Sequence, residues 1–207
     1  MPLLTTALHP VPLAPEISLH LADSRVGLFD LTDGEFRSDE PPPFWAFVWA
    51  GGQALARWVL DHPDEVRGRT VLDVAAGSGV AAIAAAVAGA SAVTAVDLDP
   101  GASAAVRRNA AANGVSVTAA TMDATAAGPC DVLLAGDVFY NRRVAERMTP
   151  FLRARARAGT RVLVGDPSRG YFPERLCVLL AEYAVPVPAA LEDCESLVTG
   201  VYEIHAT

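Results

Sequence analysis

The stretch from residue 70 to residue 100 constrains the fold of this chain more than any other. It holds two apolar segments, a loop of small residues and an alanine-rich run, in the order 70–74, 75–79, 80–89 and 92–96. The alanine-rich run ends near Gly89, and Asp97 stands directly after the second apolar segment. This order predicts a buried strand, a glycine-bearing turn, a helix and a second buried strand with an acid at its tip. Such a unit forms half of a nucleotide-binding α/β fold.

The loop predicts which nucleotide this unit binds. A dinucleotide site needs the pattern Gly-x-Gly-x-x-Gly, because the pyrophosphate lies on the helix N-terminus. The loop lacks that pattern, and the carboxylate of Asp73 near the end of the first strand would repel a pyrophosphate. S-adenosylmethionine instead carries an ammonium, a sulfonium and a ribose, whose two hydroxyls Asp97 can bind. The residues therefore favour S-adenosylmethionine over NAD, and the alternative is a loop that only makes a tight turn.

Composition narrows the class of protein. The 207 residues suit one domain, and a hydrophobic content of 52% is ample for one core. A formal net charge of −8 argues against a protein that binds nucleic-acid backbones. The cysteines Cys130, Cys177 and Cys194 lack C-x-x-C spacing, so we expect free thiols in a reducing compartment. The four histidines lack ligand spacing, and no metal site is expected.

The N-terminal part predicts neither a signal peptide nor a membrane anchor. Its first residues lack a basic stretch followed by an apolar core, and the longest apolar run is too short to span a bilayer. We therefore expect a cytoplasmic protein without a membrane partner. Residues 1–43 are rich in proline and are predicted to form an extension packed on a main domain of residues 44–207. Within the extension, the apolar segments 17–21 and 26–31 suggest a hairpin, or a strand and a loop.

The rest of the chain alternates predicted strands and helices. Helices are expected at 53–61, at 143–158, at 173–183, and after Asp99 as N-cap with Pro100 at the first helical position. Strands are expected at 115–119, 131–135 and 160–164, and the segments 190–198 and 201–205 are expected to pair antiparallel. The pattern predicts an α/β fold, a single Rossmann-like domain. Its sheet would have seven strands, mostly parallel, with helices on both faces.

Carboxylates follow the predicted strands with unusual regularity. They are Asp73, Asp97, Asp123, Asp137 and Asp166. In open α/β sheets the ligand binds beyond the carboxyl ends of the strands, so these five residues predict the edge that carries the site. Asp166 precedes Pro167, and we expect it to form a turn rather than to contact substrate. Trp45 lies in an aromatic run and is expected in the core.

Several segments resemble a known family. The loop and Asp97 are similar to those of class I methyltransferases, which have a seven-stranded sheet. Three further segments resemble protein lysine methyltransferases of that class: FWAFVWAGGQALAR (44–57), LAGDVFYN (134–141) and VGDPSR (164–169). They are most similar to the electron transfer flavoprotein β-subunit lysine methyltransferase family and its bacterial relatives. The early segment LAPEISLHL (13–21) resembles that family's leading segment, so the resemblance covers nearly the whole chain.

The resemblance implies an S-adenosylmethionine-dependent methyltransferase that acts on a lysine side chain of a protein, such as electron transfer flavoprotein β. It implies that Asp137 and Tyr140 face the acceptor lysine as the catalytic residues. The backbone of the loop would run beside the methionine part of the cofactor, Asp97 would bind the ribose, and Met122 or Asp123 would flank the adenine. The full predicted cofactor site is Trp49, Asp73, Ala75, Ala76, Gly77, Gly79, Asp97, Leu98, Met122, Asp123 and Gly136.

The chain departs from the family pattern at a few positions. Ala75 replaces a glycine that is common in such loops, which requires a backbone conformation open to L-residues. Ala50 stands where the family often has proline, and Arg142 and Arg143 stand where relatives are often acidic. Two alternatives to protein methylation stay open: a small-molecule N-methyltransferase and a cofactor-binding protein without activity. Short connections favour a macromolecular acceptor, and the presence of both Asp137 and Tyr140 argues against an inactive protein.

Overall fold

The computed structural model describes residues 4–23, 42–188, 190–192 and 194–205. Within these residues, seven strands form one sheet in the order β5-β4-β3-β6-β7-β9-β8. The strands are β3 (Thr70–Val74), β4 (Ala92–Asp97), β5 (Thr118–Thr121), β6 (Val132–Gly136), β7 (Arg161–Asp166), β8 (Cys177–Pro186) and β9 (Ser196–Ile204). The strands from β5 to β7 run parallel, and β9 is antiparallel to both of its neighbours. The predicted seven-stranded, mostly parallel sheet is confirmed.

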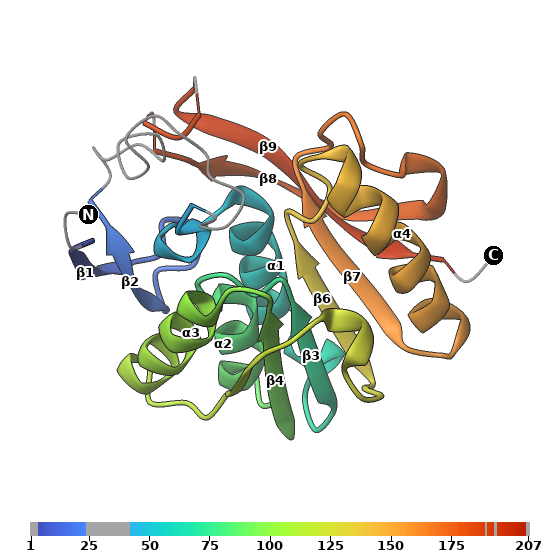
Figure 1. Ribbon diagram of the computed structural model, residues 1–207, viewed down its shortest axis with the longest axis horizontal. Helices are drawn as coiled ribbons and strands as arrows, with labels where there is room; N and C mark the ends of the chain where they lie inside the picture. The colour runs from blue at the N-terminus through green and yellow to red at the C-terminus, as the bar shows by residue number, and fades with distance from the viewer. Residues whose placement is uncertain (1–3, 24–41, 189, 193, 206–207) are drawn as a thin grey trace.

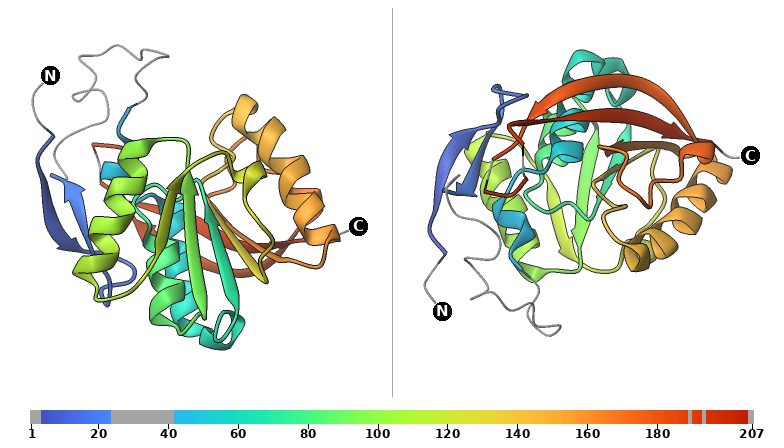
Figure 2. Two further views of the ribbon diagram at one scale, coloured as in Figure 1. Left: turned by 60° about the horizontal axis from the view of Figure 1, so that its bottom comes forward. Right: turned by 90° about the horizontal axis from the view of Figure 1, so that it is seen from above.

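In the described part of the chain, four α-helices cover the two faces of the sheet (Figure 1). They are α1 (Ala50–Asp61), α2 (Val80–Val87), α3 (Pro100–Ala112) and α4 (Arg142–Arg157). The first three pack on one face around an alanine- and valine-rich core, and α4 packs on the other around Phe139 and Leu152. Figure 2 shows the same two layers from other directions. None of these helices is long and apolar enough to cross a membrane.

A separate two-stranded sheet precedes α1. β1 (Thr6–Pro10) pairs antiparallel with β2 (Ser18–Ala22), and β2 lies beside α3 (Figure 2). Two asparagines of α3 and its C-cap hold β2 in place. The backbone N–H of His20 donates to Asn109 Oδ1 at 2.8 Å, and that of Ser18 donates to Asn113 Oδ1 at 2.9 Å. The predicted strand at 17–21 is thus present with β1 as its partner, while segment 26–31 lies outside the described residues.

The prediction for the last third of the chain was partly wrong. Residues 173–183 form a short 3-10 turn followed by β8, not a helix. The strands predicted at 190–198 and 201–205 do not pair with each other: the single strand β9 (Ser196–Ile204) includes only the end of the first and most of the second. Leu, Ala and Glu in this segment favour a helix locally, but pairing with β9 along the length of β8 overrides that weak preference. Gly200 lies within β9, paired with Asp166 and Glu182, and the ring of Tyr202 occupies the space that a side chain at this position would need.

Other boundaries moved by a few residues. β5 lies at Thr118–Thr121 instead of 115–119, because the residue after the α3 turn, Val115, still donates its N–H to Ala110 O at 3.1 Å. The helix predicted at 53–61 begins at Ala50, so that Gly51 and Gly52 belong to its first turn. This early start brings the backbone of α1 against the ends of β6 and β7, where the predicted site lies.

Gly51 and Gly165 let α1 and β7 touch backbone to backbone. A Cβ atom on Gly51 would lie 2.0 Å from Gly165 O and 2.7 Å from Asp137 Oδ2, so no side chain fits there. Gly51→Ala is therefore expected to lower the free energy of unfolding by about 3 kcal/mol, the upper end of overpacking effects, seen as a lower melting temperature. Gly52→Ala is the matched control, because its Cβ would meet only the end of the Val80 side chain, at 3.0 Å. Equal melting temperatures for the two variants would contradict this packing.

Candidate functional site

The loop between β3 and α2 has the backbone of a ligand-binding turn. Ala75, Gly77 and Gly79 all adopt left-handed conformations, with φ of 53°, 51° and 83°. Two of them are glycines and bear this conformation without cost, whereas Ala75 pays about 1–2 kcal/mol for it. The expectation that Ala75 keeps a backbone open to L-residues is therefore wrong. Backbone strain of this kind is typical of functional sites, where the surrounding structure holds it in place.

Asp97 lies at the tip of β4 and is bound to this loop. Its Oδ2 accepts the backbone N–H of Gly77 at 3.0 Å, and its Oδ1 accepts that of Asp99 at 3.0 Å. A carboxylate has about four acceptor positions, so each oxygen keeps one for a ligand hydroxyl. Burial is the main cause that raises the pKa of Asp97. Asp99 itself accepts the N–H of Gly101 at 2.7 Å and caps α3, which confirms the predicted cap.

Asp73 lies beneath the loop rather than at its surface. Only 2% of the residue is exposed, and its Oδ2 accepts the N–H of Ala82 in the first turn of α2 at 3.0 Å. Burial raises the pKa of Asp73 to about 7. One oxygen therefore supports α2, and contact of this residue with the cofactor stays a prediction.

The residues predicted around the adenine differ in their surroundings. Leu98 is 63% exposed at the turn after Asp97, and Met122 is half-buried with its N–H bound to Asp97 O at 2.8 Å. Asp123 is engaged elsewhere, since its carboxylate caps the short turn at Thr125 and forms an ion pair with Arg147. Leu98 and Met122 thus offer apolar surface beside Asp97, whereas Asp123 has partners of its own.

Asp137 follows β6 in a strained and enclosed position. Its φ of 54° is left-handed, which is uncommon for a residue other than glycine but is tolerated best by Asn and Asp. Its Oδ2 accepts the N–H of Gly52 at 3.0 Å, and its own N–H donates to Gly165 O at 2.9 Å. The other oxygen, Oδ1, is buried and has no hydrogen-bond partner among the described residues. Burial first, and then the charge of Asp166, raises the pKa of Asp137 to about 7.

Tyr140 lies at the mouth of the same edge. It is 45% exposed, and its ring packs on Phe44 with 6.0 Å between centroids. Burial raises the pKa of its hydroxyl, and the negative charge of Asp97 raises that pKa further. Asp137 and Tyr140 both lie in the turn that precedes α4, which was predicted at 143–158. α4 begins at Arg142, and its N-cap is Asn141, whose side chain accepts the N–H of Val144 at 2.9 Å.

The two tryptophans occupy different places. Trp49 is the half-buried residue before α1, and its indole N–H donates to Phe44 O at 2.9 Å. Trp45 was expected in the core but is only half-buried, with its indole over Gly101 at the start of α3. Trp45 therefore lies next to the acidic turn at Asp97 and is a candidate for cofactor contact that sequence reasoning missed. The role of Trp49 beside the cofactor stays a prediction.

Asp166 was expected to form a turn and not to contact substrate. Its Oδ1 does form the predicted turn, accepting the N–H of Arg169 at 3.1 Å. The residue is nevertheless fully buried, and its Oδ2 has no hydrogen-bond partner among the described residues. The sequence showed only that Asp166 stands at the end of a predicted strand. Its closeness to Asp137 follows from the pairing of β6 with β7, which the sequence does not reveal.

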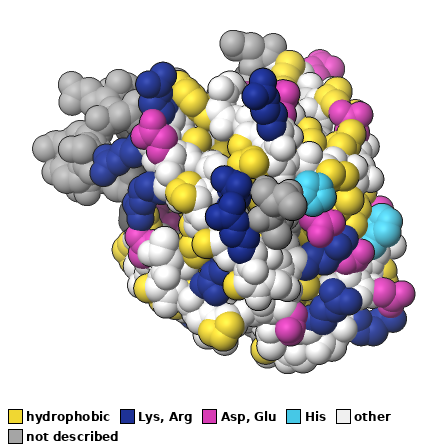
Figure 3. Space-filling model, turned by 90° about the vertical axis from the view of Figure 1, so that its right-hand side faces the viewer, with side chains coloured by type: hydrophobic (Ala, Val, Ile, Leu, Met, Phe, Trp, Pro, Cys, Tyr) yellow, Lys and Arg dark blue, Asp and Glu magenta, His cyan; other side chains and the backbone are white. Residues whose placement is uncertain are grey.

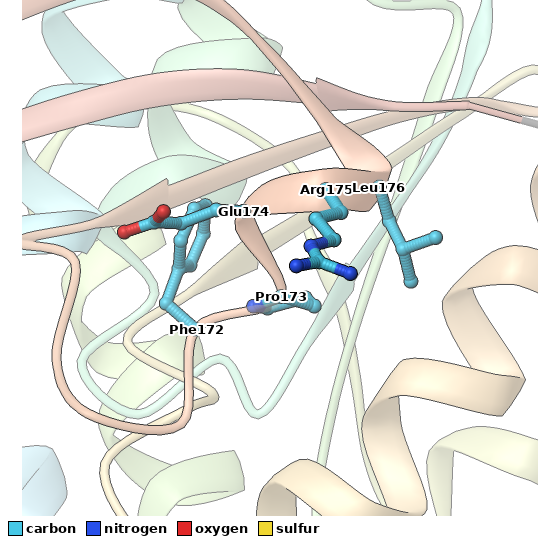
Figure 4. Close-up of a pocket in the computed structure, with 5 residues that line it drawn as sticks. All are labelled: Phe172, Pro173, Glu174, Arg175 and Leu176. Atoms are coloured by element: carbon cyan, nitrogen blue, oxygen red, sulfur yellow. The ribbon is translucent and has the colours of Figure 1, made fainter.

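Cavities elsewhere on the molecule do not coincide with this edge. One of about 340 Å³ is lined by residues 172–176, at the turn between β7 and β8 (Figure 4). Another of about 570 Å³ lies at the amino ends of the strands, beside Cys130 and Arg155. On the face shown in Figure 3, arginine and acidic side chains are interspersed, so no large area of one charge sign forms there. The strand ends with Asp97 and Asp137 remain the candidate active site.

Comparison with known proteins agrees with this geometry. The solved ribosomal protein L11 methylase of Lactobacillus delbrueckii subsp. bulgaricus is similar to this chain with a TM-score of 0.54. It is 21% identical, over 75% of this chain and 78% of that one. A family model described as ribosomal protein L11 methyltransferase (PrmA) matches residues 56–143. The sheet, the loop after β3 and the acid after β4 define an S-adenosylmethionine-dependent methyltransferase of class I.

Curated relatives identify the family. The electron transfer flavoprotein beta subunit lysine methyltransferase of Rattus norvegicus is 38% identical over 202 residues, which cover 93% of this chain and 78% of the rat protein. The protein of the same name from Xenopus laevis is 40% identical over 171 residues, 78% of this chain and 66% of the frog protein. The chain belongs to the electron transfer flavoprotein β-subunit lysine methyltransferase family.

Proposed function

We propose that this enzyme transfers methyl groups from S-adenosylmethionine to a lysine side chain of a protein, and that the protein is electron transfer flavoprotein β. One observation carries the lysine proposal. The Oδ1 atom of Asp137 is buried and has no hydrogen-bond partner within the described part of the chain, at the edge where the loop and Asp97 lie. A buried carboxylate oxygen without a donor is costly unless a cation binds to it. The relatives are named lysine methyltransferases, and the lysine ammonium of such a substrate is a cation that could bind there.

The residues of the chain fit the proposed cofactor. The open acceptor positions of Asp97 suit two ribose hydroxyls. The loop is open at Gly77, where no atom lies within 4 Å of the position that a Cβ would take. Leu98 and Met122 offer apolar surface for the adenine. Gly136 packs closely on Gly52, where a Cβ atom would lie 2.9 Å from the Gly52 backbone nitrogen, so its contact with the cofactor remains a prediction. When bound, S-adenosylmethionine supplies an electrophilic methyl group on a sulfonium.

The protein itself contributes to the reaction by holding the acceptor amine in position. A free lysine has a pKa of about 10.4, so it arrives as an ammonium and must lose a proton before its nitrogen has a lone pair. The ionised carboxylate of Asp137 binds an N–H of that nitrogen and fixes its position, while the proton passes to water at the open mouth beside Tyr140. Tyr140 confines the side chain from the solvent side. Positioning of this kind provides most of the rate, and no strong base is needed.

The surroundings fit a protein acceptor better than the alternatives. Tyr140 is 45% exposed, so the approach to Asp137 opens at the surface, as a lysine on a folded protein requires. The chain contains no lysine, since all 16 of its basic residues are arginines, and it cannot modify itself at such a residue. We further propose that it acts in the cytoplasm without a membrane or nucleic-acid partner. The free cysteines and the net charge of −8 support this.

The absence of lysine makes the test of this function direct. The purified protein is incubated with methyl-labelled S-adenosylmethionine and either electron transfer flavoprotein or a cytoplasmic extract. We expect label on a lysine of electron transfer flavoprotein β, located by peptide mass spectrometry. Label on another protein would replace the substrate, label only on small amines would support the small-molecule alternative, and no label would support an inactive protein. The Asp137→Asn variant is the control for contaminating activities.

A further inference from the structure

Asp166 presents a second buried carboxylate beside Asp137. β6 and β7 are neighbouring parallel strands in which Gly136 pairs with Gly165, so the two aspartates follow a matched pair. The Oδ1 of Asp137 and the Oδ2 of Asp166 are both buried, and neither has a hydrogen-bond partner among the described residues. The backbone N–H of Asp137 donates to Gly165 O at 2.9 Å, so Asp137 lies directly beside the residue that precedes Asp166. Two open acceptors therefore lie at one end of the sheet.

The neighbouring cation, Arg169, does not hydrogen-bond to the two open oxygens. Arg169 donates its backbone N–H to Asp166 Oδ1, but its guanidinium bonds to Glu192. Like charges in a buried place repel each other, and each unpartnered oxygen adds a desolvation cost. Such an arrangement is typical of a site that binds a cation with several donors. A lysine ammonium has three N–H donors on one nitrogen.

We propose that Asp166 contacts the acceptor nitrogen together with Asp137, each carboxylate accepting one of its N–H groups. The proposal rests on the proposed function. A neutral primary amine has two N–H groups and one lone pair, arranged tetrahedrally. When both N–H groups are held by the two carboxylates, the lone pair points away from both of them and toward the methyl donor. No new bond-making step is involved: one ammonium proton passes to water, the N–C bond forms, and the C–S bond breaks with its electron pair on sulfur.

This arrangement predicts how the effect of Asp166 depends on the methylation state of the lysine. The neutral unmethylated amine offers two N–H groups, the monomethylated amine offers one, and the dimethylated amine offers none. Removal of the Asp166 carboxylate should therefore lower the rate of the first methyl transfer most and that of the third least. A residue that only shaped the turn would affect all the transfers equally.

The test is Asp166→Asn, in which the amide oxygen can still accept the Arg169 N–H. The labelled protein from the extract serves as substrate, and intact-mass time courses give the rate of each successive transfer. We expect kcat/KM for the unmethylated lysine to fall at least about tenfold, the scale of one hydrogen bond to a charged group, with smaller losses for later transfers. The melting temperature and the affinity for S-adenosylmethionine should stay unchanged. Arg169→Gln is the matched control, because it removes the ion pair with Glu192 beside the same turn and leaves both carboxylates in place.

A second readout does not depend on the number of methyl groups added. The charge of Asp166 raises the pKa of Asp137, while Arg169 lowers it. Asp166→Asn should therefore move the acid limb of the kcat/KM profile to lower pH, whereas Arg169→Gln should move it to higher pH. Equal losses at every transfer with an unmoved acid limb would overturn the role of Asp166 and leave the proposed function standing. A wild-type enzyme that labels no lysine would overturn both.

Discussion

Asp137→Asn is expected to reduce the rate of methyl transfer by roughly a hundredfold or more, the scale of losing a positioned catalytic group. Asparagine tolerates the left-handed backbone at this position nearly as well as aspartate, and its amide oxygen can still accept the N–H of Gly52. The substitution therefore keeps the shape of the site and removes its charge. The rate is measured with the labelled protein substrate, and the melting temperature and cofactor affinity are measured on the same preparation.

Helix capping can be separated from catalysis by a matched variant. Asn141, not Asp137, caps α4, so Asn141→Ala should lower the stability by about 1 kcal/mol and leave turnover per folded molecule unchanged. If Asp137→Asn turned over at the wild-type rate, the proposed role of the carboxylate would be wrong. If it lost stability as Asn141→Ala does, its effect on activity would have to be corrected for the unfolded fraction.

The pKa of Asp137 makes a linked prediction about pH. The carboxylate must be ionised to hold an ammonium, and burial raises its pKa to about 7, so kcat/KM should fall as the pH drops below about 7. The effect on stability has the opposite sign. The folded state binds this proton more tightly than the unfolded chain, so the stabilisation is complete below the unfolded pKa of about 4 and is lost as the pH rises through about 7. At pH 8 the Asp137→Asn variant should melt no lower than the wild type.

Asp97→Ala is expected to weaken the binding of S-adenosylmethionine at least about tenfold. Its two oxygens each bind one backbone N–H and keep an acceptor position for a ribose hydroxyl. Hydrogen bonds to a charged group contribute about 1.5–3 kcal/mol, and about 1.4 kcal/mol corresponds to a factor of ten in affinity. Loss of the bond to Gly77 also frees the loop, which adds to the effect. Isothermal calorimetry measures the affinity for the cofactor and for its demethylated product.

Asp99→Ala is the control for this experiment. Asp99 caps α3 through Gly101, and its backbone N–H, which binds Asp97, is retained in the variant. The variant should lose about 1 kcal/mol of stability and keep its cofactor affinity. Unchanged affinity in Asp97→Ala would place the ribose at another acid. An equal loss in both variants would indicate that the turn matters as a whole, and not the carboxylate of Asp97.

Much of the nucleotide half could be predicted because its signals are local. The strand at Thr70–Val74 and the helix start at Asp99 and Pro100 depend on residues close to one another in the chain, and the structure has them at those positions. Local signals were ambiguous for the segment that became β8. Its composition favours a helix, and only its partner β9 makes it a strand.

The residues of the candidate site also differ in whether local sequence signals could predict their positions. The sequence by itself determined that acids follow the strands and that Asp97 and Asp137 lie at the carboxyl edge, because parallel strands end on one side. Two other features depend on the tertiary structure: Asp166 lies beside Asp137, and Gly51 lies against Gly165. These contacts join segments far apart in the chain, and a backbone approach that excludes even one Cβ atom depends on how the helix and the sheet pack. The physical reason is that burial and close packing are properties of the assembled layers, which no local pattern contains.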